Sequence, residues 1–168
     1  MKQVSTFLCT LLLLSATFVF SQGQSGKAGV GVSLVNTGIR YFGAFNADII
    51  VPYWINQRFM IQPRFGITQQ DKPSQIRIGA DFYSHFRDGE KVSPYVTFGA
   101  LLFFDNKYLA GKSQSDFLFN LGLGGEYFWD EKASIGGDTG FLLTKNGASG
   151  MKAFIGTYAQ AILRWYLK

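Results

Sequence analysis

Apolar residues recur at every second position through most of the chain after residue 26, and short polar segments interrupt this alternation. Eight stretches carry the pattern: residues 27–35, 41–55, 58–68, 75–86, 92–104, 116–128, 133–143 and 151–167. Successive side chains of a β-strand point to opposite faces, so each stretch predicts a strand with one apolar face. Segments rich in Asn, Asp, Gly and Lys separate the stretches and are typical of turns. The pattern therefore predicts an all-β chain of eight strands.

The first 21 residues follow a different pattern. One cation, Lys2, precedes an uncharged apolar run at residues 7–20, which ends in small and polar residues. This is the layout of a secretory signal peptide, so we expect residues 1–21 to be cleaved and residues 22–168 to form one domain of 147 residues. Cys9 is the only cysteine and lies within the leader. The mature chain is therefore expected to contain no disulfide and no thiolate site.

Charges of both signs occupy mid-strand positions on the polar face of the predicted strands, interspersed with glycines. The six residues concerned are Arg64, Arg77, Asp81, Glu126, Asp138 and Arg164. A narrow closed lumen has room for long charged side chains beside glycines, and unpaired charges inside it would be costly. We therefore predict that these six residues form a network of ion pairs inside a barrel. Alternation alone also fits a soluble barrel with its apolar face inside.

Aromatic residues gather at one level of the predicted strands. The three tryptophans, Trp54, Trp129 and Trp165, all fall near strand ends on the side of the C-terminus, and Tyr53 and Tyr127 join them. Aromatic rings favour the interface between a membrane and water, so we predict that these five residues form a girdle there. Strand parity places Trp54 inward unless Pro52 shifts the register.

The composition favours a barrel that spans a membrane. Hydrophobic residues make up 47% of the chain and charged residues only 16%. After the leader, the longest uncharged stretch covers residues 92–104 and is too short to cross a bilayer as a helix. An open sheet with so much apolar surface would aggregate through its edges, and closure removes the edges. We therefore predict a single eight-stranded antiparallel up-and-down transmembrane β-barrel.

Two segments carry a resemblance to a known family. Residues 121–140 (LGLGGEYFWDEKASIGGDTG) resemble the penultimate hairpin of small OmpA-type (opacity-like) outer-membrane β-barrels, and residues 158–167 (YAQAILRWYL) resemble their closing strand. The resemblance implies an eight-stranded barrel in the outer membrane of a Gram-negative bacterium, and we expect this barrel to be a monomer. Its implied partners are outer-membrane lipid, lipopolysaccharide and the barrel-assembly machinery. The chain departs from the family in ending on Leu167 and Lys168 rather than on an aromatic residue, and in placing Pro63 within a strand, where a bulge is one solution.

Residues that could carry a reaction are scarce. His85 is the only histidine, and its neighbour Ser84 would point to the opposite face of the strand, so the two are not expected to form a nucleophile and base. No histidine cluster is present, and we predict no catalytic site, no metal site and no cofactor. Residues 22–168 carry a net charge of +4 with no run of Lys and Arg, which argues against a nucleic-acid surface.

We predict the first of three functions and keep the other two as alternatives. The first is a non-enzymatic outer-membrane barrel of structural or surface-interaction type, whose lumen is plugged by the charged network. The second is a small-solute channel, which requires that network to leave a continuous water path. The third is a secreted soluble barrel that carries an apolar ligand, in which Phe98, Phe119 and Leu121 would point inward.

Overall fold

The computed structural model describes residues 25–37, 46–68, 75–86, 91–105, 116–146 and 152–167. The predicted signal peptide and its cleavage site lie outside these residues. The strands are β1 (Gly29–Thr37), β2 (Asn46–Ile50), β3 (Tyr53–Trp54), β4 (Phe59–Thr68), β5 (Gln75–His85), β6 (Val92–Asp105), β7 (Asp116–Phe128), β8 (Ala133–Asn146) and β9 (Lys152–Tyr166). Within the described ranges, no helix has the length and apolarity needed to cross a membrane.

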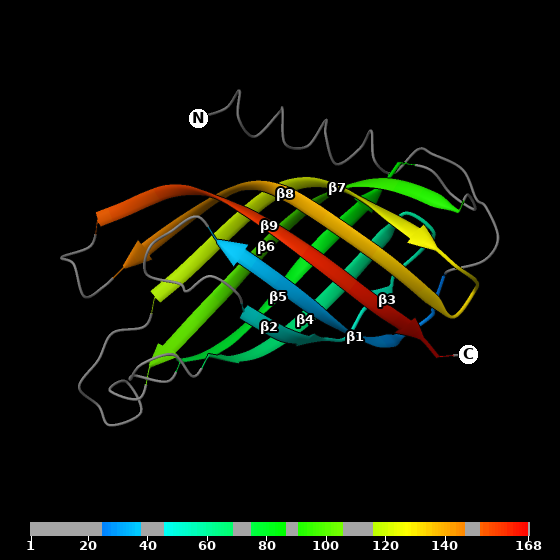
Figure 1. Ribbon diagram of the computed structural model, residues 1–168, viewed down its shortest axis with the longest axis horizontal. Coiled ribbons are helices and arrows are strands. Elements are labelled where there is room, and N and C mark those ends of the chain that lie inside the picture. Colours follow the sequence, from blue (N-terminus) through cyan, green and yellow to red (C-terminus); the bar gives the residue numbers. More distant parts are fainter. Residues whose placement is uncertain are drawn as a thin grey trace, which may run out of the picture.

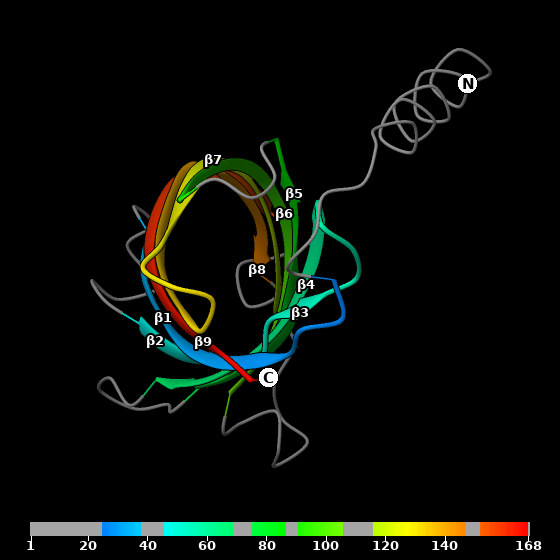
Figure 2. The same cartoon turned by 90° about the vertical axis from the view of Figure 1, so that its right-hand side faces the viewer.

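The strands form one antiparallel sheet that closes on itself. Their order is β2-β1-β9-β8-β7-β6-β5-β4-β3, and β2 also pairs with β4. Figure 1 shows the strands running obliquely across the molecule, and Figure 2 shows them as a ring seen from one end. The prediction of a closed antiparallel barrel is therefore confirmed.

β2 and β3 are two parts of a single barrel strand, which brings the number of barrel strands to eight. Both pair with β4 in one continuous register. The break falls at Val51 and Pro52. The Val51 N–H donates to the Pro63 carbonyl at 2.9 Å, but Pro63 has no N–H with which to return the bond. The Pro52 carbonyl likewise accepts the Gly29 N–H at 2.9 Å, and Pro52 itself has no donor to offer. Two prolines thus interrupt the ladder without shifting its register.

Pro63 is accommodated without the bulge that the sequence suggested. In the β4–β5 ladder, Pro63 stands opposite Ala80, and every pair from Phe59 to Thr68 keeps the same register. The missing N–H faces the strand formed by β2 and β3, so its cost is confined to that side of β4.

Large apolar side chains point away from the barrel axis, and the charged ones point inward. Leu121 is 58% exposed and Ile155 is 80% exposed, whereas Arg77 and Glu126 are buried. Phe98 and Phe119 are also exposed. The alternative of a soluble carrier with Phe98, Phe119 and Leu121 inside is therefore wrong, because the period-two alternation presents the apolar set on the outer face.

Short turns join the strands at one end of the barrel. The Asn56 side-chain oxygen accepts the backbone N–H groups of Arg58 and Phe59, each at 2.9 Å. The Asp130 carboxylate accepts those of Lys132 at 2.7 Å and Ala133 at 2.9 Å. These are side-chain-capped turns of the kind that Asn and Asp favour. β9 ends at the same level, so we call this the C-terminal end of the barrel and the other the opposite end.

Candidate functional site: the barrel lumen

A buried ion pair lies in the lumen near the C-terminal end. The Glu126 carboxylate from β7 lies 2.9 Å from the Arg164 guanidinium from β9, and both side chains are fully buried. The Tyr166 hydroxyl donates to Glu126 at 2.8 Å, and the Ser134 hydroxyl donates to the same carboxylate oxygen. An ion pair removed from water is tolerated when further hydrogen bonds satisfy its oxygens, and Glu126 has this support.

Trp54 is inside the barrel, so its predicted place in the membrane girdle is wrong. Its side chain is 2% exposed, and its ring lies 4.6 Å from the His85 ring and 6.5 Å from the Tyr166 ring, between ring centres. The physical reason is that Pro52 does not shift the register of the strand. The alternation of side chains along the strand therefore points Trp54 inward. Trp54 therefore packs over the lumen at its C-terminal end.

This placement predicts different environments for the three tryptophans. In vesicles that contain lipids with brominated acyl chains, quenching falls off steeply with distance from lipid. A protein whose only tryptophan is Trp54 should therefore be quenched less than proteins that retain only Trp129 or only Trp165, both of which are exposed. Replacement of the other two tryptophans by phenylalanine makes the three samples, and fluorescence measures the quenching. Stronger quenching of Trp54 than of Trp129 would restore Trp54 to the girdle.

The other predicted girdle residues point outward near the C-terminal end. Trp129 follows β7, Trp165 lies near the end of β9, Tyr53 lies in β3 and Tyr127 lies near the end of β7, and all four are exposed. Outward-pointing aromatic rings at one level of a barrel have the arrangement that interfacial girdles require.

A chain of hydrogen bonds crosses the middle of the lumen and runs through the neutral side chains of Gln62, Tyr83 and Gln160. Arg164 donates to Gln62 at 2.7 Å, and Gln62 donates to the Tyr83 hydroxyl at 3.1 Å. Gln160 donates to the same hydroxyl at 3.2 Å and to Asp138 at 2.7 Å. Asp138 was expected in the ion-pair network, but its hydrogen-bond partners are Gln160 and Tyr95, the latter donating at 3.1 Å. The carboxylate is thus stabilised by neutral donors rather than by an arginine.

Four charges form a compact group further along the lumen, which we call the charged layer: Asp48, Arg64, Arg77 and Asp81. Arg64 donates to Asp48 through Nε at 3.0 Å and to Asp81 through Nη1 at 2.9 Å. Arg77 donates to the other oxygen of Asp48, at 2.6 Å through Nη2 and 3.1 Å through Nε. All four side chains are buried, and two acids balance two arginines.

Asp48 is the functional residue that the sequence analysis missed. It shares its carboxylate between two arginines, and parity alone places it on the polar face of residues 41–55. The sheet register explains the grouping, because Asp48 stands opposite Gly66, which in turn stands opposite Arg77. A Cβ on Gly66 would collide with the Asp48 carboxylate and the Arg77 guanidinium. Glycine here provides the space in which the pair meets.

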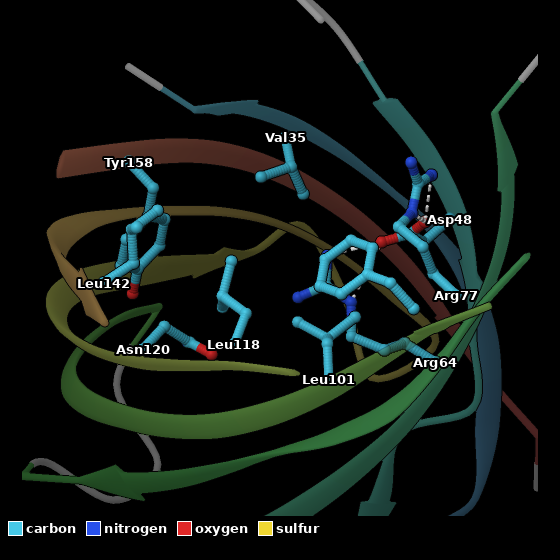
Figure 3. A pocket seen from close by; sticks show the side chains of 10 residues that line it. Val35, Asp48, Arg64, Arg77, Leu101, Leu118, Asn120, Leu142 and Tyr158 are labelled. Carbon is cyan, nitrogen blue, oxygen red and sulfur yellow. Dashed lines mark hydrogen bonds and ion pairs between the residues drawn. The ribbon is translucent and has the colours of Figure 1, made fainter. Parts of the chain in front are cut away.

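An apolar pocket occupies the lumen at the opposite end. Five inward-pointing side chains form its walls: Val35, Leu101, Phe103, Leu118 and Leu142. The space between them is small and is open on one side. Figure 3 shows the pocket reaching the charged layer on one side and Asn120 and Tyr158 on the other. The sequence analysis predicted a lumen filled by polar and charged side chains, so it missed this pocket. The signal that could have revealed it is the stretch 92–104, which is apolar on both faces and must therefore place apolar side chains in the lumen.

One geometry in the lumen resembles a hydrolytic triad but is sealed. The His85 Nδ1 lies 2.9 Å from the Ser93 hydroxyl, and its Nε2 lies 3.7 Å from the Glu126 carboxylate. Ser93 is buried and Trp54 covers His85, so a substrate carbonyl would have to displace the packed rings to reach the hydroxyl. Within the described part of the chain, no group of His, Cys, Asp and Glu side chains could hold a metal ion.

Comparisons with known proteins bear on the fold. No protein-family model matches the chain, and no curated protein matches it by sequence. Among solved structures, the N-terminal β-barrel domain of Pseudomonas aeruginosa OprF is similar with a TM-score of 0.62 at 13% identity, over 87% of this chain and 100% of that one. A de novo designed transmembrane β-barrel gives 0.54 at 10% identity over 88% and 100%. The outer membrane protein OprG from Pseudomonas aeruginosa gives 0.50 at 10% identity over 86% and 97%. These similarities confirm the fold that the resemblance implied, a small closed antiparallel β-barrel.

Proposed function

We propose that this chain is a non-enzymatic integral outer-membrane protein of structural or surface-interaction type, whose lumen is closed by side chains. The observation that carries the proposal is the direction of the two faces. Large apolar side chains cover the outside of the barrel, while the ion pairs of Asp48, Arg64, Glu126 and Arg164 lie inside. Soluble monomers rarely expose contiguous apolar patches larger than a few hundred Å². Hydrocarbon is the solvent that suits this outer face.

The girdle and the turns suggest an orientation. Exposed aromatic residues at the C-terminal end would lie in the headgroup zone of one leaflet, and the short turns at that end would face the periplasm. In this proposal the barrel is a monomer, its outer surface contacts outer-membrane lipid and lipopolysaccharide, and the barrel-assembly machinery inserts it.

The closed lumen is supported by the packing near the C-terminal end. Trp54, Tyr83, Tyr95 and Arg164 are among the largest fully buried side chains. The Tyr83 and Tyr95 rings meet edge to face at 5.0 Å, and the Arg164 guanidinium lies over the Tyr83 ring at 4.8 Å. Eight-stranded barrels are just wide enough for side chains to fill. The apolar pocket opens the opposite half of the lumen, and this observation keeps a small-solute channel as the second candidate.

Cell fractionation tests the membrane location. The protein is expected in the outer-membrane fraction, and its mobility on a gel should differ between unboiled and boiled samples, because a closed barrel resists denaturation by detergent until it is heated. Recovery of folded protein in the aqueous fraction without detergent would contradict the proposal.

Planar-bilayer recording tests the closed lumen. Protein that has been shown by the gel assay to be folded should insert without producing steady single-channel steps, because the side chains around Trp54 and Arg164 fill the cross-section. Reproducible steps of constant size would contradict the plug and support the channel. The gel assay on the same sample separates a closed barrel from an unfolded one.

A further inference from the structure

His85 is buried at the C-terminal end of the lumen with one ring nitrogen unsatisfied. Its Nδ1 lies 2.9 Å from the Ser93 hydroxyl, whereas its Nε2 has no hydrogen-bond partner among the described residues. The Glu126 carboxylate lies 3.7 Å from Nε2, which is too far for a hydrogen bond. A neutral imidazole can leave this nitrogen without a proton, so the packing suits the neutral ring.

The groups that face His85 give little support to a positive charge. Glu126 attracts a cation, but its own charge is already matched by Arg164, which lies 2.9 Å away and repels one. The other titratable or charged side chains near the ring are three phenols, a carboxylate that accepts from one of them, and a partly exposed arginine: Tyr83, Tyr95, Tyr166, Asp138 and Arg58. A proton on His85 would therefore place a second cation beside Arg164 in a fully buried cluster, and a buried ion that lacks hydrogen bonds is costly.

Trp54 covers this cluster and is held there by ring packing. Its ring centre lies 4.6 Å from that of His85, 6.4 Å from that of Phe128 and 6.5 Å from that of Tyr166. The Trp54 Nε1 has no hydrogen-bond partner among the described side chains, although a buried indole N–H usually finds one. The covering position thus leaves a donor of Trp54 itself unsatisfied, and contact with water would satisfy it.

We propose that His85 is a proton-dependent latch for Trp54 at the C-terminal end of the lumen. While the imidazole is neutral, Trp54 packs over it and the lumen is closed. When His85 takes up a proton from water, its Nε2–H needs an acceptor, and water provides one once Trp54 turns away. The indole ring also attracts a cation, but the two ring planes are tilted by 44° and an aromatic face does not replace the missing hydrogen bond. The inference rests on the proposed closed lumen and adds acidification as the condition that opens this end.

His85 is the only histidine in the chain, so its protonation can be observed directly. Protein without a histidine tag, labelled with ¹⁵N at histidine and held in lipid nanodiscs, is followed by NMR from about pH 8 to about pH 4. This range covers the ordinary titration of histidine and extends below it. In the same protein, with Trp54 as the only tryptophan, acrylamide quenching of fluorescence measures the access of water to Trp54. Quenching should rise with the same midpoint as the imidazole protonation and approach that of a protein that retains only Trp129.

Two controls separate the latch from other effects of acid. His85→Gln keeps a polar side chain that does not titrate, so Trp54 should stay protected in this variant throughout the pH range. A protein that retains only Trp165, which points outward, should show no step at that midpoint. The gel assay at each pH shows whether the barrel remains folded. If His85→Gln does not fold, the agreement of the two midpoints decides, because both are measured with His85 in place.

Four results would overturn the latch. Protonation of the imidazole while Trp54 stays protected would show that the two are not coupled. An imidazole that stays neutral over the whole range would show that the folded barrel has no such switch. The same rise in quenching in folded His85→Gln would assign it to a carboxylate. Loss of the folded gel mobility at the midpoint would mean that the whole barrel unfolds. None of these results changes the membrane location, which fractionation tests at neutral pH.

Discussion

Replacing Asp48 with asparagine is expected to lower the free energy of unfolding by about 3–5 kcal/mol, the usual cost of removing one partner from a buried ion pair. Asparagine has nearly the shape of aspartate, so the change leaves no large cavity. What it removes is the negative charge that accepts from Arg64 at 3.0 Å and from Arg77 at 3.1 Å. The charged layer then holds two arginines and only one acid, Asp81, and all three of these side chains are buried. Urea titration of the folded barrel in lipid vesicles, followed by tryptophan fluorescence and the gel assay, measures the loss.

A second substitution tests whether the loss comes from charge. Adding Arg77→Met to Asp48→Asn leaves Arg64 paired with Asp81 and restores neutrality, so part of the lost free energy should return. With Arg77→Met also measured alone, the four proteins form a double-mutant cycle that isolates the interaction energy of the pair. If the double variant is destabilised as much as Asp48→Asn alone, or more, then the loss of free energy of unfolding comes from packing and not from the unmatched charge.

The matched control is an acid with little burial. The Glu131 side chain is 91% exposed and lies 3.9 Å from the Lys27 ammonium group. Glu131→Gln is expected to change the free energy of unfolding by no more than about 1 kcal/mol, because exposed ion pairs contribute little. Similar losses for Asp48→Asn and Glu131→Gln would contradict the distinction between a buried and an exposed pair.

The strands were predictable from the sequence because their period of two is read directly from side-chain polarity. The predicted stretch at residues 116–128 coincides with β7 (Asp116–Phe128), and that at 58–68 differs from β4 by one residue. The two-part strand β2 and β3 falls within a single predicted stretch, since prolines remove hydrogen bonds without changing the direction of side chains.

The grouping of charges was less predictable, because it depends on how strands distant in sequence align. Parity places Asp48 and Arg77 inward, but only the register across Gly66 brings them together. The prediction for Trp54 was wrong for a different reason. It followed the general preference of tryptophan for membrane interfaces, whereas the alternation of side chains along the strand points Trp54 inward. The pocket was missed for a third reason: where both faces are apolar, as at Leu101 and Leu102, alternation carries no information about which side faces the lumen.

Placing an arginine on the outer face at Leu121 is expected to cost about 2–4 kcal/mol of folding free energy in lipid vesicles, the range for a cation at the bilayer midplane. Leu121 lies near the middle of β7 and stands opposite Phe98 on β6 and Phe141 on β8, both of which are also exposed. The arginine would therefore enter a wholly apolar neighbourhood with no acid across the strand. Urea titration of folding into vesicles measures the difference between Leu121→Arg and the unaltered protein.

The control for depth lies on the same strand and face. Tyr127 is exposed near the end of β7, so Tyr127→Arg should cost only about 0–1 kcal/mol, because its side chain reaches the headgroup zone. In water the expectation differs, since exchanging one exposed side chain for another usually changes stability by no more than about 0.5 kcal/mol at either position. A cost that is large at Leu121 and small at Tyr127 is therefore characteristic of hydrocarbon around the middle of the barrel. Equal small effects at the two positions would mean that the apolar belt does not lie in a membrane.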